Sequence, residues 1–126
     1  MKKILVLLTF MLTVVISNAQ VYKLESNRIR TGNFHWQRYE VNYATSTEHN
    51  SFVYLTDKTI EVYDCSTNAM VFKFVLTKRK EAGFYEAINA YDNHRILILM
   101  DKKVMSIIDY ETSDVIEFVI SSFYKL

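Results

Sequence analysis

The chain has 126 residues, one cysteine, no proline, and 15 basic against 14 acidic side chains. So small a charge imbalance gives no field that would attract nucleic acid or an anionic membrane, and neither is an expected partner. A single cysteine excludes an internal disulfide, and the length fits one domain around one core.

Residues 1–19 have the pattern of a signal peptide. MKK gives a basic start, the apolar run ILVLLTFMLTVVI follows, and small residues precede a cleavage point at Ala19. The run is shorter than the roughly 20 residues that cross a bilayer, which disfavours the alternative of an uncleaved anchor. We expect cleavage near Ala19, a single domain over residues 20–126, location in the periplasm or secretion, and no stable membrane insertion afterwards.

Alternation of apolar and polar residues dominates the rest of the chain, and no segment has a helical stripe. Tyr39, Val41 and Tyr43, for example, alternate with charged or amide side chains. The pattern predicts strands at about 21–25, 36–43, 51–56, 59–63, 70–76, 84–91, 95–100, 103–109 and 114–121.

One stretch is repeated. KTIEVYDCSTNAMVFKFVL begins at Lys58, and KKVMSIIDYETSDVIEFVI begins at Lys102. In each, an Asp ends a strand and a Thr follows three residues later, at 64 and 67 and again at 109 and 112. We interpret both as turns, because Asp can accept hydrogen bonds from turn amides and from the Thr hydroxyl. Asn68, and Ser113 or Asp114, would then adopt the left-handed backbone conformation.

About eight antiparallel strands joined by short turns predict an all-β meander, forming a small closed or partly open barrel. The alternative is a two-sheet β-sandwich. Residues 95–100, RILILM, are apolar on both faces. Either something covers the second face, such as the C-terminal SSFYKL tail or a partner chain, or the lumen and the wall are both unusually apolar. Leu97 and Leu99 are therefore candidate interface residues, and a homodimer is compatible with the pattern.

The segments NAQVYKL, FHWQRYEVN, FVYLTDKTIEVYD and RILILMDKKVMSIIDYET carry a resemblance. From residue 21 to 120 the chain resembles a loose group of small exported β-meander proteins of Bacteroidota. The resemblance implies export and a meander. The group has no assigned activity, so the resemblance implies no catalytic or binding residue.

Local motifs give no support to catalysis or to a metal or cofactor site. Cys65 lies within a predicted turn without an activating partner. His35, His49 and His94 are far apart in the chain, and no zinc-ligand spacing accompanies them. We therefore predict no catalytic residue, no metal and no cofactor, and we take the basic segment 77–81 as a solvated hairpin loop.

Aromatic residues are in excess, with 17 among residues 20–126. Most belong in a core, but Tyr and Trp also line mixed polar and apolar pockets, so Trp36, Tyr39 and Tyr43 are candidate ligand-binding residues. The first hypothesis is an exported binding module for an apolar or amphipathic small ligand. The alternative is an envelope or secreted protein-interaction or accessory protein that uses an apolar strand surface. Enzyme activity is the least favoured.

Overall fold

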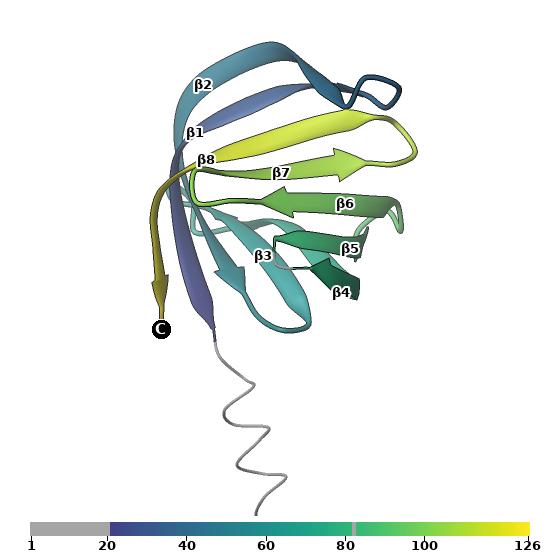
Figure 1. Ribbon diagram of the computed structural model, residues 1–126. Helices are drawn as coiled ribbons and strands as arrows, with labels where there is room; N and C mark the ends of the chain where they lie inside the picture. Colours follow the sequence, from purple (N-terminus) through teal and green to yellow (C-terminus); the bar gives the residue numbers. More distant parts are fainter. Residues whose placement is uncertain (1–20, 82) are drawn as a thin grey trace, which may run out of the picture.

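The computed structural model describes residues 21–81 and 83–126, so the predicted signal peptide lies outside the described residues. Eight strands follow one another (Figure 1). They are β1 (Tyr22–His35), β2 (Glu40–Leu55), β3 (Thr59–Asp64), β4 (Met70–Glu81), β5 (Phe84–Asn89), β6 (Arg95–Met100), β7 (Val104–Asp109) and β8 (Asp114–Lys125). In this part of the chain, no helix is long and apolar enough to cross a membrane.

The strands form a closed antiparallel barrel. Each strand pairs with the next, and β8 returns to pair with β1, so that Tyr22 lies opposite Lys125. The amide of Leu126 donates to the carbonyl of Val21 at 2.8 Å, which extends this seam toward the two ends of the described chain. The all-β closed barrel is therefore confirmed, and the partly open barrel and the sandwich are not adopted.

The first two strands differ from the prediction, and β4 runs on to Glu81, so the basic segment 77–81 belongs to a strand rather than to a loop. A single long β1 runs on to His35, residues 36–39 form a turn, and β2 begins at Glu40. The polar segment 44–50, which looks like a loop in the sequence, is part of β2 because it pairs along β1, with Thr45 opposite Thr31. Long-range pairing thus overrides local polar composition. Two register shifts, at residues 26–28 and 31–32, divide the long strand β1 into differently aligned parts.

Three five-residue turns, 64–68, 89–93 and 109–113, share one design at one end of the barrel. The first residue is Asp64, Asn89 or Asp109, and its Oδ1 accepts the amide two residues later at 2.8, 2.9 and 2.7 Å respectively. The fifth residue has positive φ in each turn, 56° at Asn68, 62° at Asn93 and 64° at Ser113. Its amide donates back to the carbonyl of the first residue. The predicted turns are confirmed.

The fourth residue of each turn also supplies an acceptor. Thr67 and Thr112 accept the amide two residues on through Oγ1, both at 3.2 Å, and Asp92 does the same through Oδ1 at 2.9 Å. The prediction that Thr donates to the Asp carboxylate is wrong at Asp64, where Ser66 Oγ donates at 2.7 Å instead. The sequence repeat therefore marks a turn that the chain builds three times, once with Asn in place of Asp.

Apolar side chains from every strand fill the barrel interior. We call this set the inner cluster; its buried members are Leu24, Val53, Leu55, Ile60, Val62, Phe74, Ala87, Ile96, Ile98, Met105, Ile107 and Phe118. They occupy alternate positions along each strand, as strands with one face inside a barrel require. The interior is thus a packed core.

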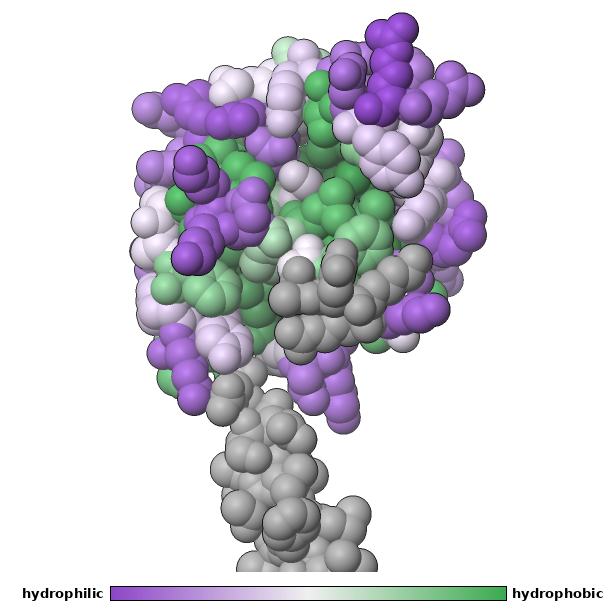
Figure 2. Space-filling view, viewed as in Figure 1, coloured by the Kyte–Doolittle hydropathy of each residue, from purple (hydrophilic) through white to green (hydrophobic). Residues whose placement is uncertain are grey.

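A second apolar cluster lies on the outside of β6, β7 and β8. We call it the outer cluster; it has Phe34, Leu97, Ile108 and Val115 buried, with Trp36, Val41, Phe84, Leu99 and Tyr110 packed around them. The tip of the β1–β2 hairpin supplies its cover. Figure 2 shows hydrophobic surface where Figure 1 places β6 and β7, surrounded by hydrophilic side chains. The predicted second apolar face exists, and the β1–β2 hairpin, rather than the predicted C-terminal tail, covers much of it.

Candidate functional site

Trp36 anchors the β1–β2 hairpin to the barrel wall. Its ring stacks on Tyr110 with the centroids 5.0 Å apart, and its Nε1 donates to Ser113 Oγ at 2.9 Å. Phe34 meets the same ring edge-on at 4.7 Å. The ring therefore makes its contacts within the chain, and a stacking role toward a ligand stays a prediction.

The two candidate tyrosines lie near the same hairpin, outside the barrel. Tyr39 is 76% exposed at φ 52°, with its ring edge-on to Phe34 at 5.8 Å. Tyr43 donates from its hydroxyl to Glu117 Oε2 at 2.9 Å. All three aromatic candidates thus lie on the outer surface, and the barrel interior belongs to other side chains.

Glu117 is a buried carboxylate that sequence reasoning missed. Arg30 Nη1 donates to Oε1 at 3.1 Å, and Ser106 Oγ donates to Oε2 at 3.2 Å, beside the Tyr43 hydroxyl. Burial, and then the hydrogen bond to Glu117, raise the pKa of Tyr43. In the sequence, the sign of this site is a single acidic residue within the otherwise apolar stretch VIEFVI of β8. With a cation and two hydroxyl donors around it, this carboxylate ties β1, β2, β7 and β8 together.

The two candidate interface residues differ in exposure. Leu97 is 3% exposed within the outer cluster, and Leu99 is half-buried at its edge. A partner could therefore touch Leu99 directly, but it would reach Leu97 only after the hairpin had moved. Their role as an interface stays a prediction.

A group of three rings lies on the outer face of β2 and β3. Phe52 stacks on Tyr63 with the centroids 5.1 Å apart, and Tyr54 stands edge-on to both. Lys23 Nζ lies 5.0 Å from the centre of the Phe52 ring, within cation–π range. The Tyr63 hydroxyl donates to Glu61 at 3.0 Å, and this bond, followed by burial, raises the Tyr63 pKa. We call Phe52, Tyr54 and Tyr63 the aromatic group.

Exposed apolar side chains continue this surface onto β4 and the turn after β5. We call Met70, Val71, Val75 and Tyr91 the β4 patch; Val71 is 47% exposed and Tyr91 is 61% exposed. Met70 pairs with Tyr63 in the β3–β4 register, and Tyr91 is close enough to Tyr63 to affect its pKa. Met70 therefore adjoins the aromatic group on the outer surface, and Lys73 lies between Val71 and Val75 on the same face of β4.

An open polar depression of about 950 Å³ lies where the β1 bulge, β2 and the 64–68 turn meet. It is lined by Asn27, Arg28, Glu48, His49, Asn50, Cys65 and Ser66. His49 Nε2 lies 3.3 Å from Asp64 Oδ2. Hydrogen bonds from Ser66 Oγ and the Ser66 amide lower the pKa of Asp64. The Ser66 hydroxyl donates to this carboxylate as part of the turn. A serine nucleophile would instead donate its hydroxyl hydrogen bond to the imidazole.

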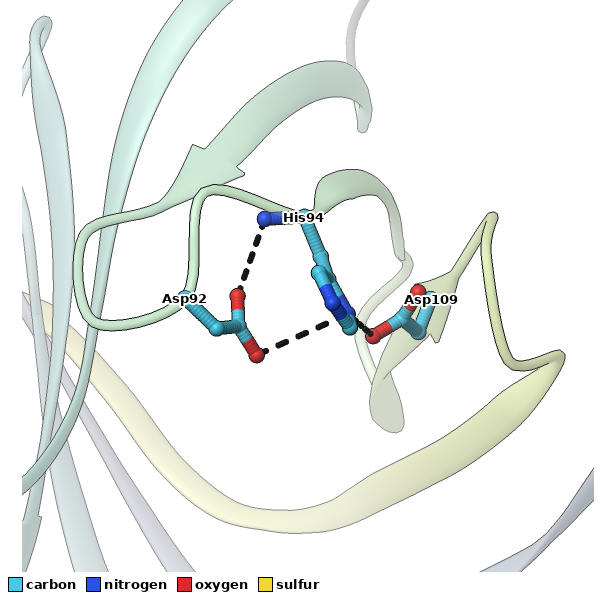
Figure 3. Close-up of side chains that lie close together, drawn as sticks. All are labelled: Asp92, His94 and Asp109. Carbon is cyan, nitrogen blue, oxygen red and sulfur yellow. Dashed lines mark hydrogen bonds and ion pairs between the residues drawn. The ribbon is translucent and has the colours of Figure 1, made fainter.

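His94 is the second histidine beside carboxylates (Figure 3). Its Nδ1 lies 2.7 Å from Asp109 Oδ2 and 3.6 Å from Asp92 Oδ2. The hydrogen bond to Asp109 is the main cause of a raised His94 pKa. Burial raises the Asp109 pKa, but the bonds from His94 and from the turn amides outweigh it and lower that pKa. His35 lies apart from both groups, exposed at the end of β1.

The architecture defines the protein as a closed, eight-stranded antiparallel meander barrel with a filled interior and a second core outside its wall. No protein-family model, curated protein or solved structure matches the chain. What the protein does must therefore be argued from its own surface.

Proposed function

We propose that the protein is exported and works as a non-enzymatic interaction module that docks a protein partner on the β4 patch and the aromatic group. The observation that carries the proposal is the β4 patch, where four large apolar side chains remain exposed although the chain has two packed apolar clusters to hold such residues. Apolar surface gathered in this way is typical of protein interaction sites.

The filled interior supports the interaction hypothesis over the hypothesis of a small apolar ligand. Fully buried side chains as large as Phe74 and Phe118 occupy the lumen. The open depression is lined by polar side chains, which suit an apolar ligand poorly. These features therefore favour an interaction protein over a carrier of small apolar ligands.

The chemistry of the surface favours a folded protein as partner. The segments of β2 and β3 that carry the aromatic group, and Val75 on β4, are paired on both sides, so a partner would bind there through side chains rather than by adding a strand. Met and Tyr are enriched at protein interfaces, Lys23 borders this surface beside Phe52, and Lys73 lies within it, opposite Glu61. The partner should therefore present an apolar surface with an acidic group that faces Lys23.

Export rests on residues 1–19, which have the three regions of a signal peptide, and on the resemblance to small exported meander proteins. The proposed site of action is thus the periplasm or the extracellular space. An interaction module there needs no disulfide when its inner cluster is as continuous as this one.

Site-specific photo-crosslinking in the producing cells tests the proposal. A photoreactive residue is placed at Val75, at Val71, and at exposed Thr47 of β2 as a control. We expect one adduct of defined mass from positions 71 and 75 and none from 47. Purified wild-type protein should compete for the adduct in a cell extract, whereas the Val75→Glu variant should compete at least about tenfold less well.

Equal adducts from all three positions, or none from 71 and 75, would reject the surface. Because Val75 is exposed, Val75→Glu should leave the thermal midpoint nearly unchanged, which separates lost docking from lost folding. An adduct of twice the mass of the chain would identify the partner as a second copy, which sedimentation of the purified protein checks.

A further inference from the structure

The 89–93 turn carries more functional groups than its design requires. In the sister turns the fourth residue is Thr, which supplies one acceptor oxygen, and the sixth residue supplies only its amide, as Ala69 does. In the 89–93 turn the fourth residue is Asp92, and its Oδ1 already accepts the amide of His94. Asp92 Oδ2 and the His94 ring are therefore surplus to turn formation.

These surplus groups converge on a carboxylate from the neighbouring turn. Asp109 uses Oδ1 for the amides of its own turn and presents Oδ2 to His94 Nδ1 at 2.7 Å. Asp92 Oδ2 lies 3.6 Å from the same nitrogen, and Glu111 Oε2 lies 3.9 Å from it. Figure 3 shows Asp92 and Asp109 on opposite sides of the imidazole. Three carboxylates from two turns thus surround one ring nitrogen.

The spacing suits a metal ion with imidazole and carboxylate ligands. One donor atom each from Asp92, His94 and Asp109 lies within 4.8 Å of the other two. A tetrahedral ion with bonds of about 2.1 Å holds its ligand atoms roughly 3.4 Å apart. The Asp92–His94 distance already fits, and the Asp109–His94 pair must open by less than about 1 Å.

The charges also favour a cation. Three carboxylates face His94, and a cation contacts this group at Glu111, where Arg95 Nε lies 3.9 Å from Oε1. The Arg95 guanidinium also lies over the Tyr110 ring, 5.6 Å from the ring centre. The acidic charge at Asp92 and Asp109 is left for a proton on the imidazole or for a metal ion to balance.

We propose that Asp92, His94 and Asp109 bind a divalent transition-metal ion of the zinc class, with Glu111 within reach of a fourth position. One nitrogen with two or three carboxylates is a normal zinc set, whereas calcium requires six to eight oxygen ligands. The bound ion joins the β5–β6 turn to the β7–β8 turn. This site is independent of the docking surface proposed above.

The sister turns supply substitutions that remove ligands and keep the fold. Asp92→Thr copies Thr67 and Thr112, His94→Ala copies Ala69, and Asp109→Asn copies Asn89. Each variant retains the side-chain acceptor or the backbone amide that its position contributes to the turn. The control is His49→Gln, which alters the other histidine–carboxylate pair, with His49 Nε2 and Asp64 Oδ2 3.3 Å apart.

Isothermal titration of chelator-treated full-length protein with ZnCl₂ tests the site. We expect one ion per chain, binding at least about tenfold weaker in each of the three ligand variants, and binding unchanged in His49→Gln. The ¹⁵N resonance of His94 Nδ1 should shift on addition of zinc to the wild type, a readout that needs no substitution.

Any of four results would overturn the proposal. Three of them are the absence of saturable zinc binding by wild-type protein, an equal loss of affinity in His49→Gln, and a His94 resonance that zinc leaves unmoved. Calcium binding at the same strength, unaffected by His94→Ala, would also reject a transition-metal site. Circular dichroism of each variant identifies any that has lost its fold, and the resonance then decides.

Discussion

The inner and outer clusters pack against opposite faces of the same strands, but they are built differently. The inner cluster consists of apolar side chains from all eight strands. The outer cluster covers β6 to β8 with a single hairpin and is bordered by polar anchors, Trp36 to Ser113 and Tyr43 to Glu117. Ile107 and Ile108 are adjacent in sequence and both buried, one in each cluster.

The difference indicates two sources of specificity. A core filled from every side is determined mainly by volume and alternation, which many apolar combinations satisfy. The position of a hairpin on a barrel wall needs directed contacts, because sliding would cost little apolar area. We therefore expect the hairpin to open locally at lower free energy than the barrel unfolds.

The largest effect is expected in the inner cluster. Phe74→Ala leaves a cavity among side chains that cannot collapse around it, and should lower the free energy of unfolding by about 3–5 kcal/mol. Denaturant titration measures this change. A loss below about 1 kcal/mol would mean that the lumen is loosely packed, and would revive an internal ligand site.

Gly32→Ala should disturb the hairpin next. A Cβ on Gly32 would lie 2.1 Å from the carbonyl oxygen of Asn42, a backbone contact that must move. We expect a loss of about 1–3 kcal/mol, with hydrogen exchange accelerated across residues 30–45 before the rest of the barrel. Uniform acceleration over all strands would show that the hairpin and the barrel unfold together.

Trp36→Phe should have a smaller effect, confined to the hairpin. It removes the Nε1 donor to Ser113 and keeps an aromatic ring against Tyr110, so the expected loss is about 1 kcal/mol. Tyr39→Phe is the matched control, because Tyr39 is mostly exposed and the change should be neutral. Equal losses from both variants would contradict an anchoring role for the indole donor.

The smallest effect concerns pH in the metal-free protein. The His94 ring faces Asp92, Asp109 and Glu111, and the Asp109 hydrogen bond raises its pKa above the ordinary value of 6.5. Since folding favours the protonated ring, this stabilisation is complete below pH 6.5 and is lost as pH rises through the raised pKa. Thermal melts with chelator should show that His94→Ala removes this part of the pH dependence. An unchanged profile would mean that His94 titrates alike in both states.

Alternation in the sequence predicts the meander well, because each strand keeps one face in the lumen. Residues 95–100 are correctly predicted to be apolar on both faces, but nothing local indicates which segment covers them. At the hairpin tip, the alternation of Tyr39 and Tyr43 with polar residues predicts a strand over residues 36–43. In the structure Tyr39 lies in a turn at φ 52°.

The surface sites were beyond sequence reasoning for a related reason. Glu117 meets Arg30 and Tyr43 only through β1 and β2, and His94 meets Asp109 only because two turns end on neighbouring strands. Spacing along the chain carries no sign of either pairing. The third copy of the turn was missed because Asn89 stands where its sister turns have Asp.

The seam between β1 and β8 makes the order of folding depend on the end of the chain. The meander can grow by hairpins between neighbouring strands, but β1 keeps an unpaired edge until the last strand arrives. Contacts of such large sequence separation form slowly and late. If the chain crosses a membrane from its N-terminus, the barrel stays open during translocation and can close only after residues 114–125 have emerged.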